Sequence, residues 1–167
     1  MTLPTPLVST DWLAANLGAP SLRVLDATVF LHVNTAGPGY TTESGLAKWR
    51  DGHVPGAQFV DLIEAFSDTA SPVRFTMPSA AEFCRRASAL GIGDDTDVVV
   101  YSTGSPMWAT RLWWMFRSVG FDRCAVLDGG FARWHAEGRP VTQDSASFAA
   151  ATLTPRPRRA GGGRARG

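Results

Sequence analysis

The stretch "VVVYSTGSPMWATRLWWMF", from Val98 to Phe116, decides the fold class of this chain. It begins with consecutive β-branched residues, which are typical of a strand covered on both faces. A short loop of small residues follows, and the apolar residues beyond Pro106 have the spacing of an amphipathic helix. Parallel α/β sheets are built from such strand, loop and helix units, and their reactive groups lie in such loops. We therefore expect an α/β protein whose functional residues lie in this loop.

Three further segments predict strands of the same sheet. They are Leu22–Ala27, Gln58–Leu62 and Cys124–Asp128, all short and rich in apolar residues. Because predicted helices separate them, parallel crossovers are favoured, and we expect a three-layer α/β sandwich with a central, mainly parallel sheet. The segment "TVFLHVNTAGPGYTTESG", residues 28–45, has no sustained period and several turn formers, which predicts a long surface loop.

Capping residues mark the ends of the predicted helices. Ser9 or Thr10 is a suitable N-cap for a first helix that closes at Gly18. The pattern "SAAE" at residues 79–82 is a capping box, in which serine and glutamate each satisfy a free backbone donor, and Gly91 ends that helix. Two more helices are expected at Trp108–Val119 and after the Gly129-Gly130 turn.

Composition favours one globular domain. At 167 residues, with 44% hydrophobic residues, 19% charged residues and six tryptophans, the chain can bury a single core of ordinary size. The sequence has no apolar run near the length of a membrane span, and its N-terminus "MTLPTPLVSTDW" lacks the basic start and apolar middle of a signal peptide. We expect a cytoplasmic protein with no membrane partner.

The charge of the chain is uneven. Its last 13 residues carry five arginines and no acid, so residues 1–154 hold 11 basic and 15 acidic groups, a balance of −4. A basic tail can bind nucleic acid or anionic membranes, but this one has no aromatic residue on which a base could stack. We therefore expect a folded domain over residues 7–148, followed by a disordered Gly/Pro/Arg-rich tail, residues 149–167, with no specific nucleic-acid partner.

Three segments together resemble the rhodanese family of thiosulfate and 3-mercaptopyruvate sulfurtransferases. They are "LRVLDA", "GHVPGAQFVDL" and the long segment from "VVVYSTGSPMW" to "VLDGGFARWHAEGRPV". The resemblance covers roughly residues 7–148 and is closest to the first, non-catalytic domain of two-domain sulfurtransferases. It implies a rhodanese-like fold and a reaction in which sulfane sulfur passes from a donor to a thiophilic acceptor.

Ser102 departs from the pattern of active domains in this family. In those domains the loop after the matching strand begins with a cysteine, which holds the transferred sulfur as a persulfide. A persulfide needs a thiolate that attacks a sulfane sulfur, and serine cannot form the sulfur–sulfur bond. The resemblance therefore implies a catalytically silent or truncated half, with no catalytic residue in this chain and with a second rhodanese domain, or self-association, as its partner.

The remaining candidate residues follow from the same resemblance. A small sulfur-containing anion is expected to bind the loop residues Ser102, Thr103, Gly104 and Ser105 together with Arg111. Arg111 and Arg117 are the basic candidates near the loop, and each either contacts an anion in a domain cleft or forms a surface ion pair. Structural roles are expected for the family's motif residues, which are Asp26, His53, Pro55, Gly56, Asp128, Gly129 and Gly130.

The cysteines and histidines predict no further chemistry. Cys84 and Cys124 lie inside a predicted helix and strand, so we expect both to be core or boundary residues without a catalytic part. Two cysteines and three scattered histidines supply no metal-ligand spacing, and we expect neither a metal nor a cofactor.

The sequence disfavours two other enzymatic interpretations and leaves one non-enzymatic alternative open. A serine nucleophile with a histidine base is disfavoured because no G-x-S-x-G elbow surrounds Ser102. A phosphatase loop would need a cysteine with an arginine six positions later, whereas Arg111 lies nine positions after Ser102. The alternative from another class is a stand-alone binding or regulatory module that holds an anion or a protein partner. In either case, aromatic residues on the helix at 108–117 are available to meet a partner.

Overall fold

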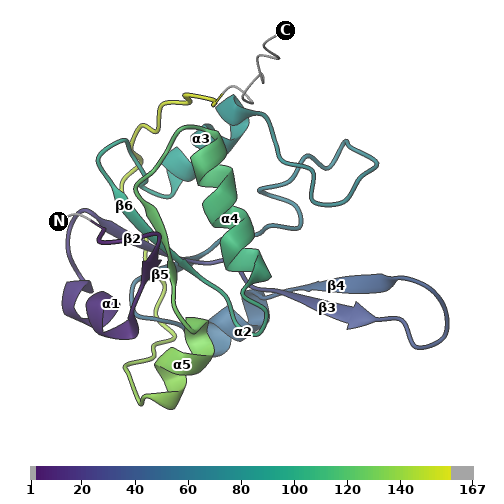
Figure 1. Cartoon of the computed structure of the whole chain (residues 1–167), viewed down its shortest axis with the longest axis horizontal. Helices are drawn as coiled ribbons and strands as arrows, with labels where there is room; N and C mark the ends of the chain where they lie inside the picture. Colours follow the sequence, from purple (N-terminus) through teal and green to yellow (C-terminus); the bar gives the residue numbers. More distant parts are fainter. Residues whose placement is uncertain (1–2, 159–167) are drawn as a thin grey trace, which may run out of the picture.

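A five-stranded parallel sheet forms the centre of the chain (Figure 1). The computed structural model describes residues 3–158. The strands lie in the order β1, β7, β6, β2, β5, and every neighbouring pair is parallel. Their bounds are Leu7–Val8 for β1, Cys124–Leu127 for β7, Asp97–Tyr101 for β6, Leu22–Asp26 for β2 and Ala57–Phe59 for β5. The predicted fold class, an α/β sandwich with a central parallel sheet, is confirmed.

Side chains of the strands alternate between two cores, one on each face of the sheet. In β6, Val98 and Val100 join the core under α3 and α4, whereas Val99 and Tyr101 join the core that contains α1 and α5. This alternation is the two-residue period of a strand, and it explains why β6 is apolar throughout. The helices are α1 (Thr10–Asn16), α2 (Leu46–Asp51), α3 (Ala80–Ala89), α4 (Met107–Ser118) and α5 (Gly130–Ala136).

Helices α1 and α3 begin where the capping residues predict. Ser9 is the N-cap of α1, and its hydroxyl accepts a hydrogen bond from the Trp12 N–H at 3.0 Å. Ser79 caps α3 in the same way, at 3.2 Å from the Glu82 N–H. The Glu82 carboxylate binds the arginines at positions 85 and 86 instead of reaching back toward Ser79. The capping box predicted for α3 is thus formed by its serine, while its glutamate stabilises the helix through ion pairs along the surface.

The segment predicted as a surface loop between residues 28 and 45 contains two strands. Strand β3 (Val29–Val33) and strand β4 (Tyr40–Ser44) form an antiparallel hairpin that projects from the body of the molecule (Figure 1). We call this hairpin the arm. The prediction was wrong because the Gly/Pro-rich turn between the strands dominates the local composition, while valine, threonine and tyrosine on either side favour extended backbone.

The folded part of the chain also extends beyond the predicted boundary at Phe148. Residues 149–158 lie against the ends of α3 and α4 as an extended strap. The strap residue Ala151 donates its N–H to the Ser88 carbonyl at 3.0 Å, and Arg156 donates to the Val119 carbonyl at 2.7 Å. Carbonyls at the end of a helix have no partner inside it, so the strap satisfies them. Composition could not predict this pairing, and the rest of the predicted tail, residues 159–167, lies outside the described residues.

The strap contributes one side chain to the core, and it requires a glycine where it passes closest to the body of the domain. Leu153 is buried in the same core as α3 and α4. Gly120 has a φ of +86°, and a Cβ atom at this position would lie 2.3 Å from the Arg156 carbonyl oxygen. Only glycine fits there, because the backbone is left-handed and the strap passes too close for a side chain. Among the described residues, no helix is both long and apolar enough to cross a bilayer.

Replacing Leu153 with alanine tests whether the strap is part of the domain. We expect Leu153→Ala to lower the free energy of unfolding by about 2–4 kcal/mol, because it removes buried methyl groups and leaves a cavity. Val73→Ala, at a largely exposed position, should change it by less than about 0.5 kcal/mol. Urea titrations followed by tryptophan fluorescence measure both values. Equal stability of the two variants would show that the strap contributes nothing to the core.

Candidate functional site

The predicted loop, residues 102–106, lies between β6 and α4 and borders a groove of about 460 Å³. The groove runs along α4 toward the β1 edge of the sheet. Of the predicted candidates it brings together Ser102 and Gly104 with Asp128, Gly129 and Gly130. Its other lining residues are Pro6, Leu7, Pro106, Ala109, Thr110, Trp113, Val126 and Leu127. The groove therefore lies at the carboxyl ends of the strands, where parallel sheets bind ligands.

Hydrogen bonds within the loop turn its polar groups inward. Ser102 is only 4% exposed, and its hydroxyl donates to the Ser105 carbonyl at 2.8 Å. Met107 donates its N–H to the Ser105 hydroxyl at 3.3 Å, and Phe131 donates its N–H to the Ser102 carbonyl at 3.3 Å. Gly130 permits this last contact, since a Cβ there would lie 2.6 Å from the Ser102 carbonyl oxygen. The loop is thus held by its own donors and acceptors.

A buried relay ties the loop to the end of β2. Thr103 donates its N–H to the Thr28 hydroxyl at 2.8 Å, and that hydroxyl donates to the Asp26 carboxylate at 2.6 Å. The Thr28 N–H donates to the same carboxylate oxygen at 3.0 Å. Thr28 was not among the predicted site residues. A signal for it was present, because an aspartate can accept hydrogen bonds from a residue two positions later in a local turn. Thr103, predicted to bind an anion, instead directs its N–H into the protein.

Burial dominates the electrostatics of Asp26. Desolvation raises the pKa of this carboxyl, while hydrogen bonds from Thr28 and Tyr101 and the charge of His53 oppose the shift. Tyr101 is the last residue of β6 and pairs with Asp26 across the two strands. Its hydroxyl oxygen accepts a hydrogen bond from the Val54 N–H at 3.2 Å. Asp26 thus connects β2, β6 and the turn that precedes β5.

The "GHVPGA" motif forms a tight turn before β5. The Ala57 N–H donates to the Val54 carbonyl at 2.9 Å, which places Pro55 and Gly56 at the two central positions. A φ of +82° at Gly56 and proline before it are the signature of a type II turn. His53 lies just before this turn, is fully buried, and stacks on the Trp49 ring at 4.1 Å.

The two ring nitrogens of His53 join the turn to a distant segment. Its Nδ1 lies 2.6 Å from the Trp49 carbonyl oxygen, and its Nε2 lies 2.7 Å from the Asp144 carbonyl oxygen. The backbone of His53 also exchanges two hydrogen bonds with Thr142. The imidazole is therefore engaged in holding residues 142–144 against the domain and is not directed at Ser102.

The arginines predicted to bind an anion contact protein groups. Arg111 lies outside the groove and donates to the Phe75 carbonyl. Phe75 has a φ of +58°, a rare conformation for a bulky residue, and packs on Trp108 with ring centroids 4.9 Å apart. Arg117 pairs with Asp122 at 3.4 Å, which is the surface ion pair expected as one of its two alternatives. Arg111 thus holds a strained backbone segment against α4.

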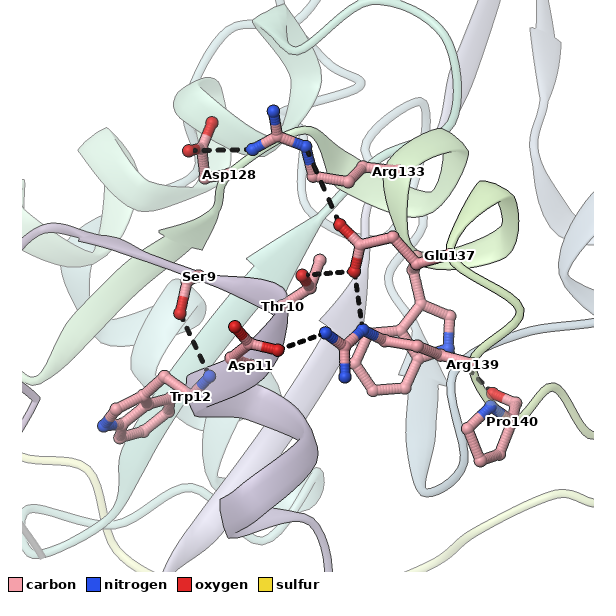
Figure 2. Close-up of polar contacts among 10 residues, drawn as sticks. Ser9, Thr10, Asp11, Trp12, Asp128, Arg133, Glu137, Arg139 and Pro140 are labelled. Atoms are coloured by element: carbon pink, nitrogen blue, oxygen red, sulfur yellow. Dashed lines mark hydrogen bonds and ion pairs between the residues drawn. The ribbon is translucent and has the colours of Figure 1, made fainter.

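A hydrogen bond between Thr10 and Glu137 and an ion pair between Asp11 and Arg139 join α1 to the C-terminal end of α5, in a network that continues to Asp128 in the groove, as Figure 2 shows. The Asp128 carboxylate accepts from Arg133 at 3.2 Å, and Arg133 also lies 4.0 Å from Glu137. Glu137 accepts from the Thr10 hydroxyl and from Arg139, each at 2.7 Å. Because Arg133 is paired with Asp128, its charge is partly neutralised at the groove. The same pair offsets the charge of the Asp128 carboxylate, so this part of the groove carries no free charge that would attract a small anion.

The thiols and histidines supply no reactive group at the loop. Cys84 and Cys124 are free and buried, and burial raises the pKa of both thiols. His32 pairs with Glu43 on the arm, and His135 stacks on Phe131. Over residues 3–158, no group of three histidine, cysteine, aspartate or glutamate side chains is placed to hold a metal ion.

Known proteins that resemble this chain are sulfurtransferases. The family described as "Rhodanese-like domain" matches residues 9–137. The thiosulfate sulfurtransferase of Cricetulus griseus is 44% identical over 83% of this chain and 46% of its own length. The 3-mercaptopyruvate sulfurtransferase of Escherichia coli K12 is 35% identical over 80% of this chain and 45% of its own length. The chain thus spans about half the length of these curated relatives.

The solved structures agree with the fold described above. The crystal structure of a 3-mercaptopyruvate sulfotransferase from Escherichia coli superposes with a TM-score of 0.76 at 29% identity. The alignment covers 92% of this chain and 56% of that one. A sulfur transferase subunit of yeast mitochondrial complex I superposes with a TM-score of 0.73 at 24% identity, which shows likeness of fold alone. It covers 90% of this chain and 52% of that one.

The buried carboxyl of Asp26 predicts a pH dependence of stability. Because its pKa is raised on folding, its favourable contribution is complete below the ordinary value of 3.8 and is lost as the pH rises through the folded-state value. Asp26→Asn lacks this titration. Its free energy of unfolding, relative to that of the unmodified chain, should therefore be higher at about pH 7 than at about pH 4. Urea titrations at both pH values measure the change.

Asp51→Asn, at an exposed aspartate, is the matched control and should keep a constant difference from the unmodified chain. If Asp26→Asn also keeps a constant difference, Asp26 titrates like an exposed carboxyl and the relay does not depend on its burial.

Proposed function

We propose, since this chain belongs to the family of rhodanese-like domains, that it is the non-catalytic half of a two-domain sulfurtransferase. The family is that of thiosulfate and 3-mercaptopyruvate sulfurtransferases. The observation that carries the proposal is the position of Ser102, which is the first residue after β6 and borders the groove. An active domain needs a thiol at this place, and the chain offers a hydroxyl bound to a carbonyl.

The chemistry of sulfur transfer explains why serine is silent. A thiolate attacks the sulfane sulfur of a donor, a sulfur–sulfur bond forms, and the donor leaves with the electron pair of the broken bond. A second nucleophile then removes the outer sulfur and restores the thiolate. An alkoxide forms too rarely at neutral pH to attack, and an oxygen–sulfur adduct would not be a persulfide. Pro106 adds a further defect, because it contributes no backbone N–H to a loop that would have to cradle an anion.

The half-length of the chain supports a partner domain. Its relatives are about twice as long, and a cysteine-bearing rhodanese domain would supply the missing thiol. Apolar side chains are exposed beside the groove, namely Leu7 on the sheet edge and Met107 and Trp114 on α4, of which Trp114 is 51% exposed. An apolar surface of this kind suits contact with another domain. The donor and the acceptor of the whole enzyme would then bind where that domain meets this one.

The groove also favours a second candidate function, that of a stand-alone binding module. It is large enough for several side chains of a partner, and its walls are mostly apolar, with Asp128 at one end. These features suit a protein segment better than the small anion expected from the sequence. A downstream reading frame that encodes a cysteine-loop rhodanese domain would favour the silent half, and its absence would favour the module.

Restoring the thiol tests the assignment of Ser102. The unmodified chain should transfer no sulfur from thiosulfate to cyanide above a denatured control. Ser102→Cys should take up one sulfur atom from thiosulfate, seen as a gain of about 32 Da on the peptide that contains position 102. Turnover should stay low, because the loop donors are already used within the protein and Pro106 lacks one.

Ser105→Cys is the matched control, since this loop position does not line the groove. It should gain no sulfur under the same treatment. Sulfur on Cys84 or Cys124 of the unmodified chain, together with measurable turnover, would overturn the silent-half proposal.

A further inference from the structure

The imidazole of His53 is buried between two backbone carbonyl groups. Its Nδ1 lies 2.6 Å from the Trp49 carbonyl oxygen, and its Nε2 lies 2.7 Å from the Asp144 carbonyl oxygen. A carbonyl oxygen accepts hydrogen bonds and cannot donate one, whereas a neutral imidazole has one N–H and one bare nitrogen. The neutral ring would therefore satisfy one contact and leave a lone pair facing the other carbonyl. The imidazolium, in which both nitrogens donate, satisfies both.

The side chain of Trp49 also suits a cation at His53. The two rings are parallel, with an interplanar angle of 6° and centroids 4.1 Å apart. The face of an indole ring carries partial negative charge and attracts a cation placed over it. The indole is held in this position because its Nε1–H donates to the Ala57 carbonyl at 3.1 Å. His53 thus lies against a π face and two carbonyl oxygens, all of which favour a positive ring.

The charges around the ring balance a buried cation. The charged and titratable groups on the elements around His53 are Asp26 at the end of β2, Tyr101 at the end of β6, Lys48, Arg50 and Asp51 on α2, and Asp144 itself. Asp26 is the buried carboxyl among them, and the charge of His53 favours its ionised form. The Lys48 ammonium lies over the Phe131 ring, 4.6 Å from its centroid, and the other charged side chains are exposed. The two buried groups, Asp26 and His53, therefore offset each other's charge.

We propose that His53 is an imidazolium in the folded chain and that its Nε2 proton latches Asp144 to the domain. When this proton leaves to the solvent, one ring nitrogen keeps a lone pair against a carbonyl oxygen, so one of the two contacts opens. The Trp49 contact is buried and joins residues four apart, whereas the Asp144 contact is partly exposed. Water can satisfy an exposed carbonyl in place of the ring. The Asp144 contact is therefore the one that opens as the pH rises.

Residues 143–148 connect this latch to the strap. Within residues 3–158, their hydrogen bonds to the body of the domain are the contact of Asp144 with His53 and one from the Gln143 side chain to a carbonyl of α2, at 3.2 Å. The next fixed point is the Phe148 ring, over which a guanidinium lies at 3.9 Å. Loss of the latch therefore loosens the chain between these points. This inference is independent of the proposed function, since it involves neither Ser102 nor the groove.

Nitrogen NMR of the whole chain tests the protonation state. Long-range proton–nitrogen correlation spectra distinguish a ring with two N–H groups from either neutral tautomer, and His53→Gln identifies the signals of this ring by their absence. His53 should carry both protons at about pH 7.5, where a free histidine with a pKa near 6.5 is about nine-tenths neutral. It should have lost one of them by about pH 9. A single ring proton at about pH 7.5 would overturn the proposal.

A nitroxide label at position 145 tests the release. Ser145 is exposed and follows Asp144, so the label on Ser145→Cys should gain a mobile component in its paramagnetic resonance spectrum as the ring loses its proton. Added to this labelled chain, His53→Gln should make the mobile component present at both pH values. The reason is that an amide group has a single nitrogen, so glutamine cannot donate to both carbonyls.

Ala150→Cys is the matched control for the label. This exposed position lies in the strap, where the neighbouring Ala151 N–H binds the Ser88 carbonyl without a histidine. Its spectrum should be the same at about pH 7.5 and about pH 9. The buried thiols of Cys84 and Cys124 are present in every variant, and the labelled parent chain measures their background.

Three results would contradict the release. They are equal changes at positions 145 and 150, an unchanged label at 145 after the ring has lost a proton, and retention of both protons through about pH 9. The first two show that the histidine does not hold this segment, and the third shows a fixed cation. None of these readouts requires His53→Gln to fold, and none depends on sulfur-transfer activity.

Discussion

The buried carboxylate of Asp26 is the interaction on which the loop end of the sheet depends. It lies beside Tyr101 because β2 and β6 are parallel and in register, and it reaches the loop only through the Thr28 hydroxyl. A buried carboxylate is tolerated when hydrogen bonds satisfy it, and here Thr28 donates twice to one oxygen. The start of the loop is therefore held in place by a carboxylate whose burial costs desolvation energy.

That relay has a consequence for the chemistry of the loop. The Thr103 N–H is turned toward Thr28, and the Ser102 hydroxyl is turned toward the Ser105 carbonyl, so both groups are used to support the loop. The polar groups at the start of the loop thus close on one another and on the end of β2. Gly130 is part of this arrangement, because its lack of a side chain lets α5 approach the Ser102 carbonyl.

The domain exposes two separate apolar surfaces. One lies beside the groove and includes Trp114, and the other lies on the arm and includes Val33. The first is built on a helix that packs on the core, whereas the second belongs to a two-stranded hairpin that projects from the body of the domain.

The sequence alone determined the fold class, the strand at 97–101 and the cap at Ser79, and it narrowed the first cap to Ser9 or Thr10, because these depend on local periodicity and local hydrogen bonds. The turn before β5 was equally predictable, because an adjacent proline and glycine define its type. Only the tertiary structure decided that the arm is paired, that the strap belongs to the core and that Arg111 contacts the Phe75 carbonyl. Each of these joins segments far apart in the chain, and the partner of a long side chain or a free carbonyl is set by packing rather than by its neighbours in sequence.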